Sequence, residues 1–166
     1  VASLLISNSD WRGRPTKKLA VFELDERSSN LILPYMRPDI MLCTNIFRDS
    51  YKRNAHPEFI LDFLNKYIPD GVPMVLNADD MMCSELKPGN PRAYFSIARQ
   101  PSDGEGSRNI VQDVPACPRC GGELKWDFRR YHHIGRAACK DCGFSSPKAG
   151  YTAVGLTETD MEVDIG

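Results

Sequence analysis

The sequence lacks several features that would assign the chain to a broad class at once. No apolar run approaches the ~20 residues of a membrane-spanning helix, and the start, VASLLISNSDW, lacks the basic and cleavage regions of a secretory signal. No charge of one sign dominates, since 21 basic residues face 22 acidic residues for a net charge of -1. We therefore expect a cytoplasmic protein without a transmembrane segment, in which anions are recognised only locally.

The composition also lacks the cysteine density of a small secreted fold. Six cysteines occur in 166 residues of which 42% are hydrophobic, so the chain has enough apolar material for a core of its own. Cys43 and Cys83 stand alone in MLCTN and MMCSE, where buried thiols are expected more than reactive ones.

The other four cysteines form two Cys-x-x-Cys pairs separated by 18 residues in CPRCGGELKWDFRRYHHIGRAACKDCGF. This spacing is typical of a tetrahedral zinc site in which each pair supplies two thiolates from one tight turn. Glycines follow the second cysteine of each pair, where the chain must curl. A disulfide is disfavoured by a reducing cytosol and an iron–sulfur cluster by the spacing. We predict a structural zinc ion bound by Cys117, Cys120, Cys139 and Cys142.

Two alternatives concern the segment KWDFRRYHH between the cysteine pairs. His132 and His133 invite a catalytic role at an open metal site, but four cysteines already complete the tetrahedron, which favours packing histidines. Basic and aromatic residues side by side could stack on single-stranded nucleic acid. The same aromatic residues need burial, so docking against the rest of the protein is the competing interpretation.

Apolar runs alternate with helical patterns in the first hundred residues. The runs at 19–24, 40–44, 74–76 and 93–97 predict strands, and the patterns at 28–36, 58–67 and 79–86 predict helices. Strands joined by helical crossovers favour a parallel sheet, so the predicted fold class is α/β.

The composition changes after the fourth predicted strand. We expect an α/β domain over residues 1–99, a linker rich in Gly, Ser and charge over 100–114, and an inserted zinc ribbon over 115–148. Apolar runs at 151–154 and 161–165 then predict that residues 149–166 return to β-structure of the same domain.

Polar side chains follow the first three predicted strands. The first run ends in FELDE with Glu23, the second continues into TNIFRDSYKRN with Asn45, and the third into LNADD with Asn77 and Asp80. Ligands of parallel sheets bind beyond the carboxyl ends of the strands, so these groups are placed to hold Mg²⁺ and the phosphates of a nucleotide. Alternatively, the acidic residues after Glu23 favour the first turn of the next helix, and the polar loops are solvated turns.

At these three strand ends the sequence resembles the central ATP-binding domain of the Mur ligase superfamily. FELDE is similar to that family's strand-terminal glutamate motif, TNIFRDSYKRN to its Thr-Asn followed by Asp-His and Arg, and LNADD to its Asn-Ala-Asp-Asp turn. With CPRCGGEL and HHIGRAACKDCGFSSP added, the motifs resemble the Mur ligase-like subunits of lipid II isoglutaminyl synthases, whose central domain carries a four-cysteine zinc ribbon.

The resemblance implies a site and a reaction. It implies that Glu23 helps to bind Mg²⁺ and that ATP is held by Glu23, Asn45, Asp49, Arg53, Asn77 and Asp80. It also implies that ATP activates the α-carboxyl group of the D-glutamate of lipid II. Ammonia released from glutamine by a partner amidotransferase subunit would then form D-isoglutamine, in peptidoglycan synthesis. Phosphorylation makes the carboxylate attackable by a neutral amine, and Mg²⁺ offsets the repulsion between two anions.

Two departures from the family pattern are present. No G-x-x-x-x-G-K-[ST] phosphate loop occurs, and Ser50 stands where most Mur ligases have a metal-binding histidine. A start at Val1 and an end at MEVDIG lead us to expect a piece of a longer protein that is inactive alone. The alternative is a binding module whose ribbon contacts a protein partner or nucleic acid.

Overall fold

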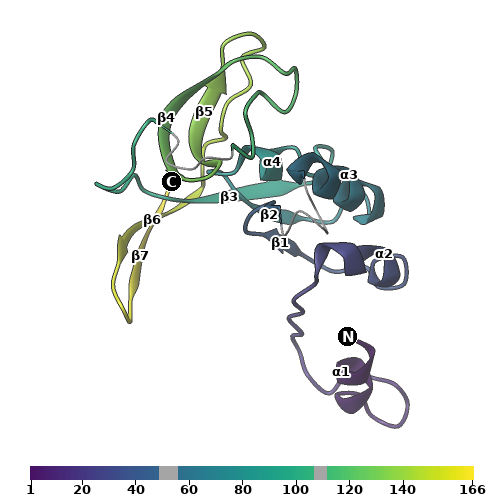
Figure 1. Cartoon of the computed structure of the whole chain (residues 1–166). Helices are drawn as coiled ribbons and strands as arrows, with labels where there is room; N and C mark the ends of the chain where they lie inside the picture. The colour runs from purple at the N-terminus through teal and green to yellow at the C-terminus, as the bar shows by residue number, and fades with distance from the viewer. Residues whose placement is uncertain (49–55, 107–111) are drawn as a thin grey trace.

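The computed structural model describes residues 1–48, 56–106 and 112–166, which form a mixed α/β structure (Figure 1). The helices are α1 (Ala2–Ser7), the short 3₁₀ helix η1 (Glu26–Ser28), α2 (Ser29–Ile32), α3 (Pro57–Tyr67) and α4 (Met81–Ser84). The strands are β1 (Met41–Cys43), β2 (Met74–Asn77), β3 (Arg92–Ile97), β4 (Leu124–Tyr131), β5 (Ile134–Cys139), β6 (Tyr151–Leu156) and β7 (Met161–Ile165).

The main sheet is mostly parallel. Its strand order is β1-β2-β3-β6-β7, with parallel pairing from β1 to β6 and an antiparallel β6–β7 hairpin at the far edge. In β2, Met74 and Leu76 are buried while Val75 and Asn77 are half buried, as alternation along a strand requires. Helix α3 covers this face with Ile60, Leu61 and Leu64.

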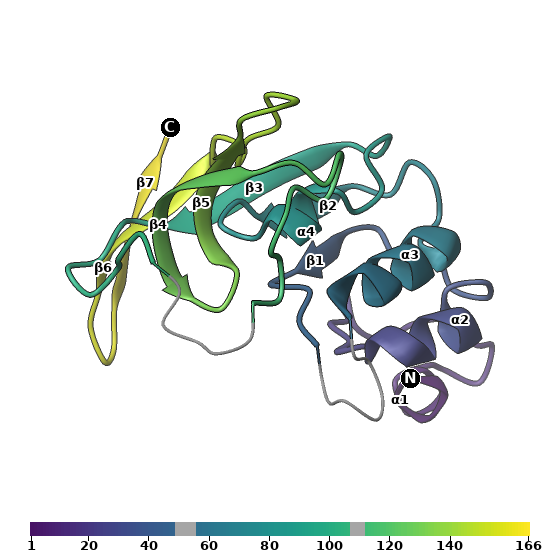
Figure 2. The ribbon, with the colours of Figure 1, turned by 45° about the horizontal axis from the view of Figure 1, so that its top comes forward.

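The ribbon occupies the connection between β3 and β6. Strands β4 and β5 form their own antiparallel pair, which lies against α4 above the main sheet (Figure 2). Leu124 and Phe144 of the ribbon belong to the same buried cluster as Leu76 and Met82. The ribbon therefore shares the hydrophobic core of the sheet.

Two loops follow neighbouring strands at the same edge of the sheet. Residues 44–48 come after β1 and are called the β1 loop, and residues 77–80 come at the end of β2 and are called the β2 turn. Because β1 and β2 are parallel neighbours, the two loops emerge together, as predicted.

Most of the predicted elements are confirmed. Strands lie at 41–43, 74–77 and 92–97, the helix predicted at 58–67 is α3, and the chain returns to the sheet as β6 and β7 after the ribbon. The helices predicted at 28–36 and 79–86 are shorter, because η1 and turns take part of the first and α4 ends at Ser84.

The strand predicted at 19–24 is wrong. These residues have no regular structure, and Leu19 and Val21 are 79% and 85% exposed. A strand needs a neighbour for its backbone hydrogen bonds. Within the described residues the sheet ends at β1, and residues 19–24 pair with no strand. The apolar run therefore stays extended without joining the sheet.

Helix α1 was not predicted. It stands apart from the sheet, and an extended segment that includes residues 19–24 leads from it to η1 and α2 (Figure 1). None of the residues of α1 is buried. No helix in the described parts of the chain has the length and apolar character needed to cross a membrane.

Candidate functional site: a four-cysteine centre beside two strand-end loops

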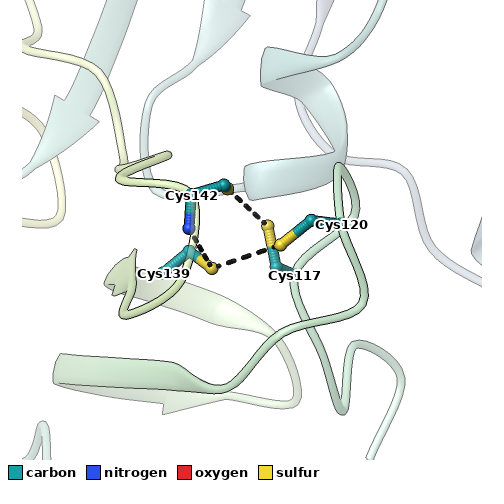
Figure 3. A group of neighbouring side chains, drawn as sticks. All are labelled: Cys117, Cys120, Cys139 and Cys142. Carbon is teal, nitrogen blue, oxygen red and sulfur yellow. Dashed lines mark hydrogen bonds between the residues drawn. The ribbon is translucent and has the colours of Figure 1, made fainter.

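The four paired cysteines come together (Figure 3). Their Sγ atoms all lie within 4.8 Å of one another, with 3.7 Å between Cys117 and Cys142 and 3.5 Å between Cys120 and Cys139. Four sulfurs placed about 2.3 Å from a tetrahedral zinc ion are about 3.8 Å apart. The cluster therefore has the size and the donor set of a structural zinc site, and its separations are far longer than a disulfide bond of about 2.05 Å.

Two equivalent turns present the sulfurs. In the first, the N–H of Cys117 donates to the carbonyl of Gly122 at 2.9 Å, and in the second the N–H of Cys139 donates to the carbonyl of Phe144 at 2.6 Å. The glycine that follows the second cysteine of each pair has a φ of 72° or 71°. Only glycine adopts this left-handed conformation readily, which explains its presence after both pairs.

Backbone donors and neighbouring sulfurs set the acidity of the thiols. The backbone N–H of Cys142, helped by that of Asp141, lowers the pKa of Cys139 to about 7. The N–H of Gly122 lowers the pKa of Cys120, but hydrogen bonds with the other three sulfurs outweigh it and raise that pKa to about 12. The cluster thus combines a readily formed thiolate at Cys139 with a thiol at Cys120 that holds its proton, which a divalent cation would displace on binding.

The β1 loop and the β2 turn brace each other. Asn77 Nδ2 donates to the carbonyl of Thr44 at 2.9 Å, and the N–H of Ile46 donates to Asp80 Oδ2 at 2.7 Å. Asp80 Oδ1 also accepts backbone N–H groups at the start of α4, and Asp80 is fully buried. In this structure Asn77 and Asp80 therefore fix the loops, and their approach to a nucleotide stays a prediction.

The remaining predicted nucleotide residues differ in their surroundings. Asn45 is exposed in the β1 loop, with Nδ2 3.5 Å from Thr44 Oγ1. Glu23 is exposed in the extended segment and forms no hydrogen bond or ion pair within the described residues. Asp49 and Arg53 lie outside the described residues. The structure thus joins Asn77 and Asp80 to the β1 loop, and no contact links Glu23 to them.

A network of ion pairs, called the ionic seam, joins the ribbon to the sheet through the buried carboxylates of Asp79 and Asp103. Arg130 Nη2 lies 3.0 Å from Asp103 Oδ2, and its Nη1 lies 3.5 Å from Asp79 Oδ2, while Arg136 Nη1 lies 3.6 Å from Asp79 Oδ1. Burial raises the pKa of Asp79, although the N–H of Ile97 and both guanidinium groups oppose it. Sequence reasoning missed this seam, because its acids and arginines are far apart along the chain.

The two histidines lie outside the cysteine cluster and pack against the loops. The side chain of His133 is 1% exposed and its Nε2 lies 3.4 Å from Asp80 Oδ1. Among the described residues, the group close enough to hold a metal ion contains four cysteines and neither histidine. The packing interpretation of the two histidines is the one that the geometry favours.

The aromatic and basic residues of β4 are also used internally. Phe128 is 2% exposed, with the guanidinium of Arg130 5.3 Å from its ring centre. Arg129 covers Trp126 at 3.9 Å, and Tyr131 stays half exposed. Docking against the sheet, rather than a stacking platform for nucleic acid, accounts for most of this segment.

Comparison with known proteins shows which family the chain belongs to. The chain is 32% identical over 139 residues to the lipid II isoglutaminyl synthase (glutamine-hydrolyzing) subunit MurT of Staphylococcus aureus, in strains COL and N315, and the match covers 82% of the chain. It is 30% identical over 146 residues, or 86% of the chain, to the subunit of the same name from Streptococcus pneumoniae. The chain is homologous to MurT. It spans about a third of the MurT relatives, 31% and 32% of their lengths.

The fold agrees with this relationship. The structure of a pseudomurein peptide ligase type C from Methanothermus fervidus superposes with a TM-score of 0.54 at 20% identity, covering 78% of this chain and 27% of that one. No protein family model matches the chain. The expected relationship to the Mur ligase superfamily is confirmed by the homology to MurT, and the mainly parallel α/β fold is similar to that of a peptide ligase.

Proposed function

We propose that this chain is part of the central domain of an ATP-dependent ligase subunit that amidates lipid II. Homology to MurT over most of the chain carries the proposal, because the relatives are named for this activity. The substrate group is the α-carboxyl of D-glutamate, which becomes D-isoglutamine in peptidoglycan synthesis. The nitrogen comes from glutamine through an amidotransferase partner subunit.

The strand-end loops support the placement of the nucleotide. The β1 loop and the β2 turn lie side by side at the carboxyl edge of parallel strands, where open α/β sheets bind their ligands. Asn45 is exposed there, and the amide of Asn77 holds the two loops together. Bound Mg²⁺ would neutralise phosphate charge so that a carboxylate can be phosphorylated, and Glu23 would be its ligand from this chain.

The four cysteines have a separate role in this proposal. Four thiolates complete a tetrahedron and leave no open position for a substrate, so a zinc ion there is structural. The residues that the structure describes provide no phosphate loop, and we propose that the chain is inactive unless it is part of the longer subunit.

The test uses the full-length subunit that contains this chain, together with its amidotransferase partner, lipid II, ATP and glutamine. Glutamine-dependent ATP hydrolysis and amidated lipid II are measured for the wild type and for Glu23→Gln. We expect the variant to lose at least about a hundredfold in rate, because metal-assisted stabilisation of charge is worth several kcal/mol.

The matched control is Glu58→Gln, which makes the same change at an exposed position of α3 and should retain full activity. Wild-type complex that hydrolyses no ATP with lipid II and glutamine would overturn the proposed function. Salt-dependent oligonucleotide binding that is lost on replacing Lys125 and Arg129 would support the binding-module alternative instead.

A further inference from the structure

The turn between β4 and β5 inserts into the place where the β1 loop and the β2 turn meet. His133 in this turn lies with Nε2 3.4 Å from Asp80 Oδ1, and its ring stacks on Phe47 of the β1 loop with 5.6 Å between ring centres and 23° between planes. One buried imidazole therefore contacts both loops at once.

His132 adds a second set of contacts with the β1 loop. Its Nδ1 lies 2.9 Å from Asp113 Oδ2, and the other oxygen of that buried carboxylate lies 2.8 Å from Nε of Arg48. The ring of His132 also meets the edge of Phe47 at 4.6 Å and 87°. The residue has a φ of 45°, an uncommon value for a side-chain-bearing residue that is retained only where the surroundings fix it.

The backbone of the ribbon grips the β2 turn as well. The N–H of Gly135 donates to the carbonyl of Asp79 at 2.7 Å, and Ile134 forms an isolated antiparallel bridge with Asp80. These backbone contacts flank the contact of His133 with Asp80. The ribbon therefore holds both the main chain and the side chains of the β2 turn.

The cysteine centre lies at the opposite end of the same hairpin. Cys117 and Cys120 precede β4, Cys139 ends β5, and Leu124 pairs with Cys139 in the first register position of the hairpin. A metal ion bound there closes the open end of the hairpin whose other end carries the two histidines. The cysteine cluster and the histidine turn, residues 132–133, are thus joined by two paired strands.

We propose that the histidine turn positions the β1 loop and the β2 turn for the nucleotide, so that zinc in the ribbon and nucleotide in the loops bind cooperatively. This inference rests on the proposed function, since it takes ATP as the ligand of the loops. His133 is a positioning residue: it acts through Phe47 and Asp80 and does not touch the nucleotide itself. Cooperativity is reciprocal, so bound nucleotide must also raise the affinity of the ribbon for zinc.

The experiment measures ATP affinity by calorimetry and zinc affinity by equilibrium competition with a chromogenic chelator, both on the full-length subunit with its partner. For His133→Ala we expect ATP to bind about tenfold more weakly, as for a lost buried polar contact, at one zinc per chain. His133→Gln should recover most of the affinity, because its planar amide can place a polar nitrogen near Asp80 at the position of Nε2. In the wild type, saturating ATP should raise the zinc affinity several-fold, as a coupling of about 1 kcal/mol requires.

Lys125→Ala is the matched control, since it alters an exposed residue of the same ribbon and should change neither measurement. Hydrogen exchange on the wild type gives a readout that needs no variant to fold. Removing zinc should raise exchange in residues 44–48 and 77–80 while leaving α3 protected.

The inference is overturned if His133→Ala retains wild-type ATP affinity with zinc bound, or if ATP leaves the zinc affinity unchanged. It is equally overturned if metal removal leaves exchange in both loops unchanged. A wild-type complex that binds no ATP at all would instead contradict the proposed function, so the two failures are distinguishable.

Discussion

Cys139 serves both the metal cluster and the last position of β5. Its sulfur accepts two backbone N–H groups and its own N–H closes the second turn. Replacing it with serine removes a thiolate ligand of lowered pKa and leaves three sulfurs. Structural zinc contributes its binding free energy directly to folding.

For Cys139→Ser we therefore expect zinc content to fall from one per chain toward zero and the ribbon to lose its protection, as measured by metal analysis and hydrogen exchange. Cys43→Ser is the control, because Cys43 lies 3.5 Å from Cys83 and outside the cluster. A Cys139→Ser protein that kept one zinc and an intact ribbon would show that the ligand set is wrong.

The cysteines and the buried acids differ in how far sequence alone predicts them. The cysteines follow a spacing that fixes their chemistry, so their gathering was predicted and is confirmed. The ionic seam was not predicted, because Asp79 and Arg130 are separated by 51 positions in the sequence and nothing local marks either residue as buried. The ligand role of the cysteines and the roles of the nucleotide residues remain predictions.

At the scale of single elements, β4 and β5 are packed more closely at one point than side chains allow. A Cβ added at Gly135 would lie 2.1 Å from the carbonyl oxygen of Phe128 and 2.9 Å from the Cα of Arg129, both in the backbone of the paired strand. Gly135 is also buried under the β2 turn. Backbone atoms in a paired strand cannot move away cheaply.

Gly135→Ala should therefore lower the free energy of unfolding by about 1–3 kcal/mol, the usual cost of overpacking, and lower the ribbon's affinity for zinc. Chemical denaturation of the zinc-loaded protein measures the first effect. Gly104→Ala provides the comparison, since a Cβ there meets nothing within 4 Å and should cost less than about 0.5 kcal/mol. An equal loss of unfolding free energy for Gly135→Ala and Gly104→Ala would contradict the close approach of β4 and β5 at Gly135.

Pattern reasoning succeeded for elements that bury a face within the described chain. Helix α3 shows helical spacing of its apolar residues, and β2 is an apolar run between turn residues, so both were found. The run at 19–24 is also mostly apolar, but within the described residues it pairs with no strand. A strand depends on its neighbour as much as on its own residues. Helix α1 buries nothing and so leaves little pattern to detect.

At the scale of the whole molecule, the seam decides whether the ribbon and the sheet unfold together. Arg130 is 16% exposed and faces two carboxylates, Asp79 and Asp103, that are each 1% exposed. Removing one partner of a buried ion pair leaves a charge without compensation, which typically lowers the free energy of unfolding by about 3–5 kcal/mol. The low end of this range, about 3 kcal/mol, applies where a second arginine remains. Arg136 is that second arginine for Asp79.

We expect Arg130→Ala to destabilise the zinc-loaded protein by about 3 kcal/mol at neutral pH and to separate the unfolding of the ribbon from that of the sheet. The loss should shrink as the pH falls, because removing the cation raises the pKa of Asp79 further and the folded state then binds the proton more tightly. Urea denaturation at neutral and mildly acidic pH checks both points.

Lys140→Ala breaks the exposed pair of Lys140 with Glu123, whose side chains are 50% and 71% exposed, and should cost less than about 1 kcal/mol at either pH. An Arg130→Ala protein as stable as this control would contradict a structural role for the seam.

The position of the ribbon between β3 and β6 also limits how the protein can be shortened. These strands are adjacent and parallel, so the chain must travel back along the whole strand before it can enter the sheet again. Most α/β proteins make that return journey with a helix, and here the four-cysteine hairpin does it. Excising the hairpin and rejoining the ends with a tight loop would therefore leave β6 unable to reach its place, whereas a substitute of a dozen or more residues, helical and free of metal, would restore the path.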